Sequence, residues 1–260
     1  MNITLLETFN TGSHAAWIDE LVRNSRHKIN VLALSGHHWK WRMHGGAVTL
    51  ARRFLASGQT PDLLLASDML DLTTFLALTR KQTAHLPTAL YFHENQLTYP
   101  WSPGDPVPQD KRDLHYGFIN YNSAMAADTI LFNSRYHMEA FTGDLPRFLK
   151  TLPDNNELGS IDSIRNKSQV LHLGLDLQRF DIYRPDNTDA DRRPPLILWN
   201  HRWEYDKNPQ EFFQALYRLQ EEGLAFEVAV AVADLEAALF ESGDECSDIE
   251  IAFAEARDGR

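Results

Sequence analysis

The sequence has almost no cysteine and no hydrophobic run long enough to cross a membrane. Cys246 is the only cysteine among 260 residues, which excludes an internal disulfide and disfavours a cysteine-based metal site. No stretch of about 18 apolar residues occurs, and the N-terminus MNITLLETFN lacks the basic and apolar regions of a signal peptide. We therefore expect a soluble, cytoplasmic protein with no membrane partner.

Excess negative charge is confined to the last part of the chain. The net charge is −11, yet residues 1–185 hold 18 basic and 18 acidic residues, and residues 186–260 hold 7 and 18. A strongly acidic protein would repel a polyanion such as RNA. Because the first part is neutral, most of that objection does not apply to it. Oligomeric state is not indicated by any of these features.

Short apolar segments alternate with amphipathic ones over the first 185 residues, which predicts an α/β fold with a parallel sheet covered on both faces. Ser13 is the predicted N-cap of the first helix. The expected strands are residues 3–6, 29–34, 63–66, 88–92 and 129–132, and the expected helices are 14–24, 47–55, 71–78 and 117–126. This pattern predicts a complete N-terminal Rossmann-like domain over residues 1–185.

A second unit of the same kind begins after a polar segment. Residues 186–195, DNTDADRRPP, are typical of a linker. A strand at 196–199, a helix at 209–222 and a strand at 226–231 then predict the start of a second Rossmann-like domain over 196–260. Residues 233–260 form an acidic, weakly periodic tail that continues no recognisable domain.

Polar residues follow three of the predicted strands, where an open α/β sheet binds ligands. The three groups are Gly12-Ser13-His14, His93-Glu94-Asn95 and Asn133-Ser134. A histidine and a carboxylate at a strand end can orient a sugar hydroxyl or accept a proton, and a glycine before a helix lets a phosphate approach the backbone. Ordinary strand-end capping and an ordinary glycine turn remain alternatives.

Two cations, Arg202 and Lys207, lie five positions apart in the loop after the first strand of the second unit. Departure of a nucleotide sugar's diphosphate builds negative charge, which two fixed cations and a helix N-terminus can stabilise without a metal. The alternative is an exposed loop in which Glu204 and Asp206 pair with these cations.

Aromatic and basic residues alternate in a further segment, Trp39-Lys40-Trp41-Arg42. Such a segment can stack on a nucleic-acid base and contact phosphates, or it can be a half-buried loop whose cations extend to solvent. The histidines show no metal-ligand spacing on a helix face, so we expect no metal.

Six segments together resemble the tRNA-queuosine α-mannosyltransferase family. They are GSH at Gly12, KWRM at Lys40, YFHENQLTYP at Tyr91, LFNS at Leu131, LPD at Leu152 and HRWEYDKNP at His201. In addition, VLHLGLDLQRF at 170–180 is similar to the segment that ends the first domain of retaining GT-B glycosyltransferases. The resemblance covers about residues 1–231.

The resemblance implies a GT-B fold and transfer of mannose from GDP-mannose to a hydroxyl of queuosine in tRNA, with retention and no metal. It implies that Arg202, Lys207 and Glu204 bind the donor, and that His93, Glu94 and Asn95 act at the reacting centre. The remaining candidates would line the acceptor cleft: Gly12, Ser13, His14, Trp39, Lys40, Trp41, Arg42, Asn133 and Ser134. After Val232 the sequence departs from the family, so we expect a truncated second domain. A non-catalytic fragment that binds only RNA or acceptor is the alternative.

Overall fold

The structure, a computed structural model, describes residues 1–100, 114–183, 194–201, 204–231 and 251–253. Within these ranges the chain divides into two compact units. The first contains the described residues of 1–99 and 107–179, and the second contains those of 100–106 and 180–260. Most of the predicted linker at 186–195 lies outside the described residues.

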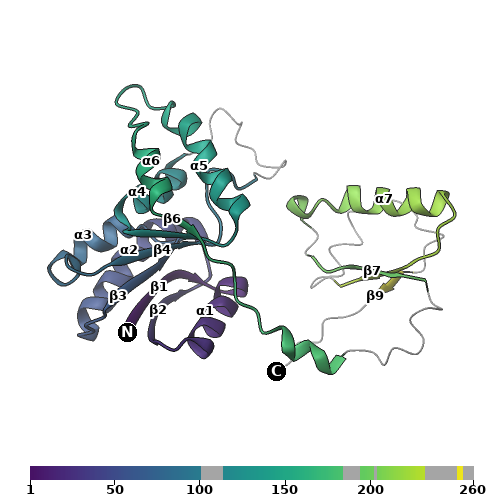
Figure 1. Cartoon of the computed structure of the whole chain (residues 1–260), viewed down its shortest axis with the longest axis horizontal. Coiled ribbons are helices and arrows are strands. Elements are labelled where there is room, and N and C mark those ends of the chain that lie inside the picture. The colour runs from purple at the N-terminus through teal and green to yellow at the C-terminus, as the bar shows by residue number, and fades with distance from the viewer. Residues whose placement is uncertain (101–113, 184–193, 202–203, 232–250, 254–260) are drawn as a thin grey trace. The chain divides into compact units, whose positions relative to one another are not determined.

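Six parallel strands form the sheet of the first unit, in the order β2-β1-β3-β4-β5-β6 (Figure 1). The predicted parallel α/β architecture is therefore confirmed. The strands are β1 (Asn2–Asn10), β2 (Lys28–Ser35), β3 (Leu63–Ser67), β4 (Thr88–Phe92), β5 (Thr129–Phe132) and β6 (Ser168–Val170).

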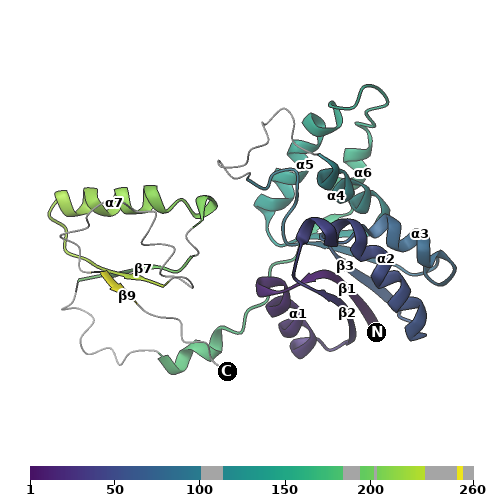
Figure 2. The same cartoon turned by 180° about the vertical axis from the view of Figure 1, so that it is seen from behind.

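Helices cover both faces of this sheet, as Figures 1 and 2 show. Successive side chains of a strand point to opposite faces, so Leu5 and Leu6 of β1 enter different cores. Leu5 packs with Ile18 of α1, and Leu6 belongs to the larger core formed with the other helices. The helices are α1 (Gly12–Asn24), α2 (Trp39–Ser57), α3 (Leu72–Thr83), α4 (His115–Ala126), α5 (Arg135–Leu149) and α6 (Ser160–Asn166).

The junction between β1 and α1 differs from the prediction. β1 continues past Leu6 to Asn10, with an irregular register between Glu7 and Asn10. α1 begins at Gly12, whose φ of +51° favours glycine, and Thr11 is its N-cap. The prediction of Ser13 as the N-cap is therefore wrong, because the turn is completed before Ser13.

Helix α2 begins at Trp39, eight residues before the predicted start at 47. The segment Trp39–Arg42 is thus the first turn of a helix, and the expected loop is wrong. The pair Gly45-Gly46 weakens the helical signal of the sequence. Packing overrides this weakness, since buried Gly46 lets the helix approach Thr8 of β1 closely.

The sequence analysis missed α5, α6 and β6. Gly143 and Pro146 lie inside α5 and obscure its helical pattern. β6 has only three residues and shows no alternation. No described helix is both long and apolar enough to span a bilayer.

The second unit contains three parallel strands in the order β7-β8-β9. Its elements begin with the end of a 3₁₀ helix, η2 (Leu177–Tyr183), and continue with β7 (Leu196–Trp199), η4 (Tyr205–Lys207), α7 (Pro209–Glu221), β8 (Glu227–Val230) and β9 (Ile251–Phe253). Trp199 and Leu216 are buried between β7 and α7, which confirms the predicted strand–helix–strand unit. β9 lies within the predicted tail, where no strand was expected.

We expect Gly46→Ala to lower the free energy of unfolding of the first unit by about 1–3 kcal/mol, the usual cost of overpacking. An added Cβ would lie 2.5 Å from Thr8 Cγ2, and Thr8 cannot rotate away freely because its hydroxyl donates to Met69 O at 2.6 Å. Gly143→Ala is the matched control, since its Cβ would meet nothing within 4 Å. Denaturant unfolding should show that control to be unchanged or stabilised by roughly 0.5–1 kcal/mol; equal effects of the two changes would contradict this account.

Candidate active site

Charged and polar side chains gather where β1, β3 and β4 end, at the carboxyl edge of the first unit's sheet. They are Glu7 of β1, His14 of α1, Asp68 after β3, and His93 and Glu94 after β4. We call these five residues the strand-end cluster. The sequence placed His14, His93 and Glu94 after separate strands, and the structure brings them together here.

Glu7 and His14 form a buried ion pair. Oε2 of Glu7 lies 2.9 Å from Nδ1 of His14, and the other carboxylate oxygen accepts the backbone N–H of Phe9 at 2.7 Å. Burial by itself lowers the pKa of His14. The hydrogen bond that His14 donates to Glu7 and the negative charges of Asp68, Glu7 and Glu94 outweigh it and raise that pKa to about 9. His14 is therefore a cation at neutral pH.

His93, in contrast, is uncharged at neutral pH. Its ring centroid lies 4.2 Å from that of His14, and burial together with repulsion from the His14 cation lowers its pKa to about 3. Trp17 contacts the His93 ring edge-on and stacks on Tyr91, with centroid distances of 4.6 and 4.7 Å. His93 is thus a neutral imidazole held in place by aromatic rings.

The backbone of His93 ties three strand ends together. Its N–H donates to Oδ1 of Asp68 at 2.8 Å, and its carbonyl accepts from Nδ2 of Asn133 at 2.8 Å. Asn133 also contacts His137 through Oδ1, and Ser134 caps α5 by accepting the backbone N–H of His137. Asn133 therefore helps to hold His93 in position by direct contact. Ser134 contributes indirectly, through His137.

The carboxyl groups of Asp68 and Glu94 lie in surroundings with little access to water. Asp68 is fully buried, and its Oδ2 has no hydrogen-bond partner. Burial raises the pKa of Asp68 well above its usual range, and it also raises that of Glu94. Glu94 is only partly exposed, and its Oε1 accepts from Nε2 of Gln96 at 3.2 Å.

Other predicted site residues have different surroundings. Asn95 shapes its own turn, since its Oδ1 accepts the backbone N–H groups of Leu97 and Thr98. Gly12 and Ser13 lie exposed at the start of α1. The roles assigned to these residues stay predictions.

The aromatic-basic segment lies on the surface of the first unit. Trp39 is 36% and Trp41 64% exposed, and Nζ of Lys40 lies 5.6 Å from the centroid of the Trp39 ring. Arg42 donates from Nε to the carbonyl of Ser35 at 3.0 Å. None of these contacts joins the segment to the strand-end cluster.

The predicted donor loop is only partly described. Arg202 lies outside the described residues. Glu204 is exposed just before η4, and Lys207 ends η4, directly before Asn208 and the first turn of α7. Nζ of Lys207 lies 3.0 Å from Oδ2 of Asp206, so the alternative pairing expected from the sequence is present for this lysine.

Spacing in the sequence gave no sign of a metal site, yet the fold brings possible ligands together. Glu7, His14 and His93 each offer a ligand atom, and these atoms all lie within 4.8 Å of one another. Nε2 of His93 is buried without a hydrogen-bond partner. This arrangement has the residue types of a zinc site, although Glu7 already binds His14.

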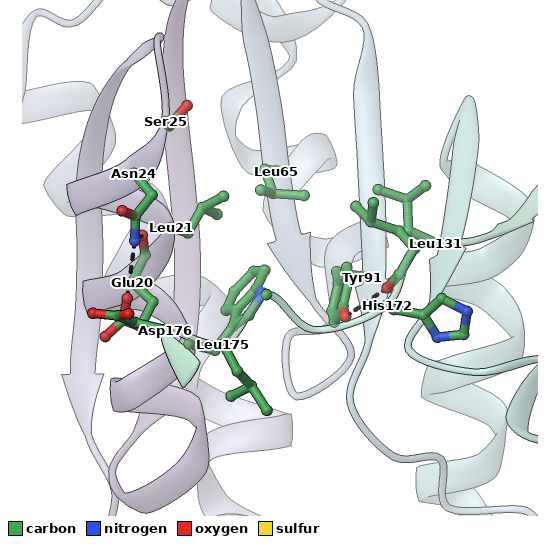
Figure 3. Close-up of a pocket in the computed structure, with 13 residues that line it drawn as sticks. Glu20, Leu21, Asn24, Ser25, Leu65, Tyr91, Leu131, His172, Leu175 and Asp176 are labelled. Atoms are coloured by element: carbon green, nitrogen blue, oxygen red, sulfur yellow. Dashed lines mark hydrogen bonds between the residues drawn. The ribbon is translucent and has the colours of Figure 1, made fainter. Parts of the chain in front are cut away.

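A groove of about 510 Å³ opens on the α1 side of the sheet, next to the strand-end cluster (Figure 3). Trp17 and Tyr91 line it, and the Tyr91 hydroxyl donates to the carbonyl of Leu171 at 2.9 Å. Glu20 and Asp176 are its acidic lining residues. The groove shares Trp17 with the surroundings of His93, while its other walls are largely apolar.

Glu7 and Asp68 were missed by the sequence analysis. Both are acidic residues at the end of an apolar strand segment, the same signal that singled out His93 and Glu94. The strand was expected to end before Glu7, which concealed that this side chain is buried within β1.

Two solved structures of glycosyltransferases match the fold of this chain. The catalytic domain of starch synthase IV from Arabidopsis thaliana, bound to ADP and acarbose, matches with a TM-score of 0.56 at 11% identity, covering 99% of this chain and 74% of that one. A lipopolysaccharide outer core galactosyltransferase, WaaB, in its apo form, also matches with a TM-score of 0.56 at 11% identity, covering 98% and 68%. The chain thus has the GT-B-like fold of such enzymes.

Sequence comparison is more specific. Residues 2–175 match the family described as tRNA-queuosine alpha-mannosyltransferase N-terminal, and the chain belongs to that family. It is 32% identical over 236 residues to tRNA-queuosine alpha-mannosyltransferase of Drosophila melanogaster, a match that covers 88% of this chain. The chain spans about 60% of the length of this curated relative.

We expect His14 to titrate near pH 9 and His93 to stay neutral down to about pH 3, as read from histidine ring shifts by NMR. The raised pKa of His14 contributes stability that is complete below its ordinary value of 6.5 and is lost as the pH rises through about 9. Its full size is about 3 kcal/mol.

Glu7→Gln should lower the pKa of His14 and remove most of this pH dependence, because it deletes the negative partner. Glu139→Gln, an exposed change on α5, is the control and should leave both unchanged. A His14 pKa at its ordinary value in the unaltered protein would show that the ion pair does not set the charge of the cluster.

Proposed function

We propose that this chain belongs to a retaining glycosyltransferase that moves mannose from GDP-mannose to queuosine in tRNA. The observation that carries the proposal is the family match over residues 2–175, which includes the entire strand-end cluster. Sites at the carboxyl ends of parallel strands are the usual ligand sites of α/β proteins, which agrees with this assignment. The tRNA substrate also favours action in the cytoplasm.

In this proposal, the first unit holds the acceptor, and His93 orients a reacting hydroxyl. The low pKa of His93, about 3, suits a neutral hydrogen-bonding group better than a base that must hold a proton near neutral pH. The acceptor hydroxyl forms the new glycosidic bond as the bond from mannose to the diphosphate breaks. The departing diphosphate oxygen can then take the hydroxyl proton.

Arg202 and Lys207 stabilise the departing diphosphate in the same proposal. Two features of the second unit support this role for Lys207. It lies just before α7, and the electrostatic field at a helix N-terminus favours a bound anion such as a diphosphate. Asp206 forms an ion pair with this lysine at 3.0 Å, and a bound diphosphate would compete with Asp206 for it. With two such cations, the transfer needs no metal ion.

The decisive experiment measures transfer of labelled mannose from GDP-mannose to tRNA that contains queuosine, beside the same tRNA with guanosine at that position. We expect label only in the queuosine tRNA, with no change when EDTA is present. Calorimetry should show GDP binding in preference to UDP. Binding of queuosine tRNA without GDP binding or transfer would identify an acceptor-binding fragment and overturn the proposal.

Lys207→Ala should reduce the rate of transfer by roughly 10²–10³-fold, the usual loss when one donor to a developing oxyanion is removed. Arg202→Ala should have an effect of the same order. The control is Arg218→Ala, an exposed change further along α7, which should keep the full rate. Normal turnover by the Lys207 variant would show that this lysine only forms its ion pair.

A further inference from the structure

The strand-end cluster contains more carboxyl groups than cationic side chains. His14 is its one cation, and that imidazolium is bound to Glu7. Asp68 and Glu94 form no ion pair with any lysine or arginine in the part of the chain that the structure describes. Neither carboxylate therefore has an ion-pair partner of its own, and both share the more distant charge of His14.

Burial makes this arrangement costly. Asp68 is fully buried and its Oδ2 lacks any hydrogen-bond partner, a state that usually costs a few kcal/mol unless the group meets a partner or becomes protonated. A bound cation would remove this cost directly.

The position of the two carboxylates fits a ligand that also reaches His93. Asp68 accepts the backbone N–H of His93, and Glu94 is the next residue in the chain. Glu94 is partly exposed, so it can touch a ligand, and Asp68 adds negative charge behind it. A cation bound here would lie beside the residue that orients the acceptor hydroxyl.

Queuosine has a charge of the required sign. Its cyclopentenediol is joined to the 7-deazaguanine ring through an aminomethyl group, and such an aliphatic amine is protonated at neutral pH, as lysine is. The ammonium is attached to the ring that carries the hydroxyls. One ligand can thus place its ammonium at the carboxylates and a hydroxyl at His93.

We propose that Glu94 and Asp68 form a specificity site for the secondary ammonium of queuosine, with Glu94 in direct contact and Asp68 behind it. This inference rests on the proposed function for the identity of the ligand. Its physical basis is the pair of carboxylates beside His93 that have no ion-pair partner of their own. Ordinary guanosine carries no such cation, so the site would separate modified from unmodified tRNA.

Calorimetry with two small probes tests the site without any transfer reaction. The first probe, 7-aminomethyl-7-deazaguanine, carries the cation, and the second, 7-cyano-7-deazaguanine, has the same ring without it. We expect the cationic probe to bind about ten to a hundred times more tightly, the range expected for hydrogen bonds to a charged group. Higher salt should weaken binding of the cationic probe more than that of the neutral one.

Asp68→Asn and Glu94→Gln should each remove most of this preference, measured as the ratio of the two dissociation constants. Asn can still accept the His93 N–H, and Glu94 is partly exposed, so at least the Glu94 variant should fold. Glu139→Gln, an exposed change on α5, is the control and should keep the preference.

Three outcomes would overturn the inference. The probes bind equally well, or the preference survives both substitutions, or Zn²⁺ or Mg²⁺ binds in a manner that depends on Asp68 while the amine probe does not. Failure of the proposed function is a separate result. Transfer of mannose to tRNA without amine preference would leave the function intact, and amine preference without transfer would leave the cation site intact.

Discussion

The ion pair between Glu7 and His14 influences the protonation of the titratable groups around it. By holding His14 positive, Glu7 places a cation 4.2 Å from the His93 ring, as measured between ring centroids, and so helps to keep His93 neutral. The same cation acts on Asp68 and lowers its pKa against the larger effect of burial. Loss of the pair would therefore change the protonation of several groups together, since buried charges interact strongly.

The sequence predicted the fold class and the strand ends of the first unit, because short apolar segments and the polar residues after them are local signals. β4 and β5 are found at the predicted residues, 88–92 and 129–132. Features that depend on distant packing were missed. Gly46 sits inside α2 because Thr8 lies against it, and Glu7 is buried because β1 runs past the expected end.

In the candidate site, too, local signals were predicted and the effects of distant packing were not. His14 and His93 were predicted as separate strand-end residues, and the fold brings them into ring contact. Asp68 was not predicted, since a single aspartate after a strand resembles an ordinary cap until its burial is known. The assignment of Arg202 and Lys207 depended on resemblance to a family, because five-residue spacing alone is equally typical of an exposed charged loop.

The strand order β2-β1-β3-β4-β5-β6 bears on how the cluster is assembled during synthesis. β3 adds to the free edge of β1, and from β4 onward each new strand adds to the edge left by the previous one, so no later strand has to insert between earlier ones. Domains commonly begin to fold from the N-terminal side as the chain emerges. Glu7, His14, Asp68 and His93 would then meet once β4 has docked, and the first unit would take shape on the ribosome before the second unit is made.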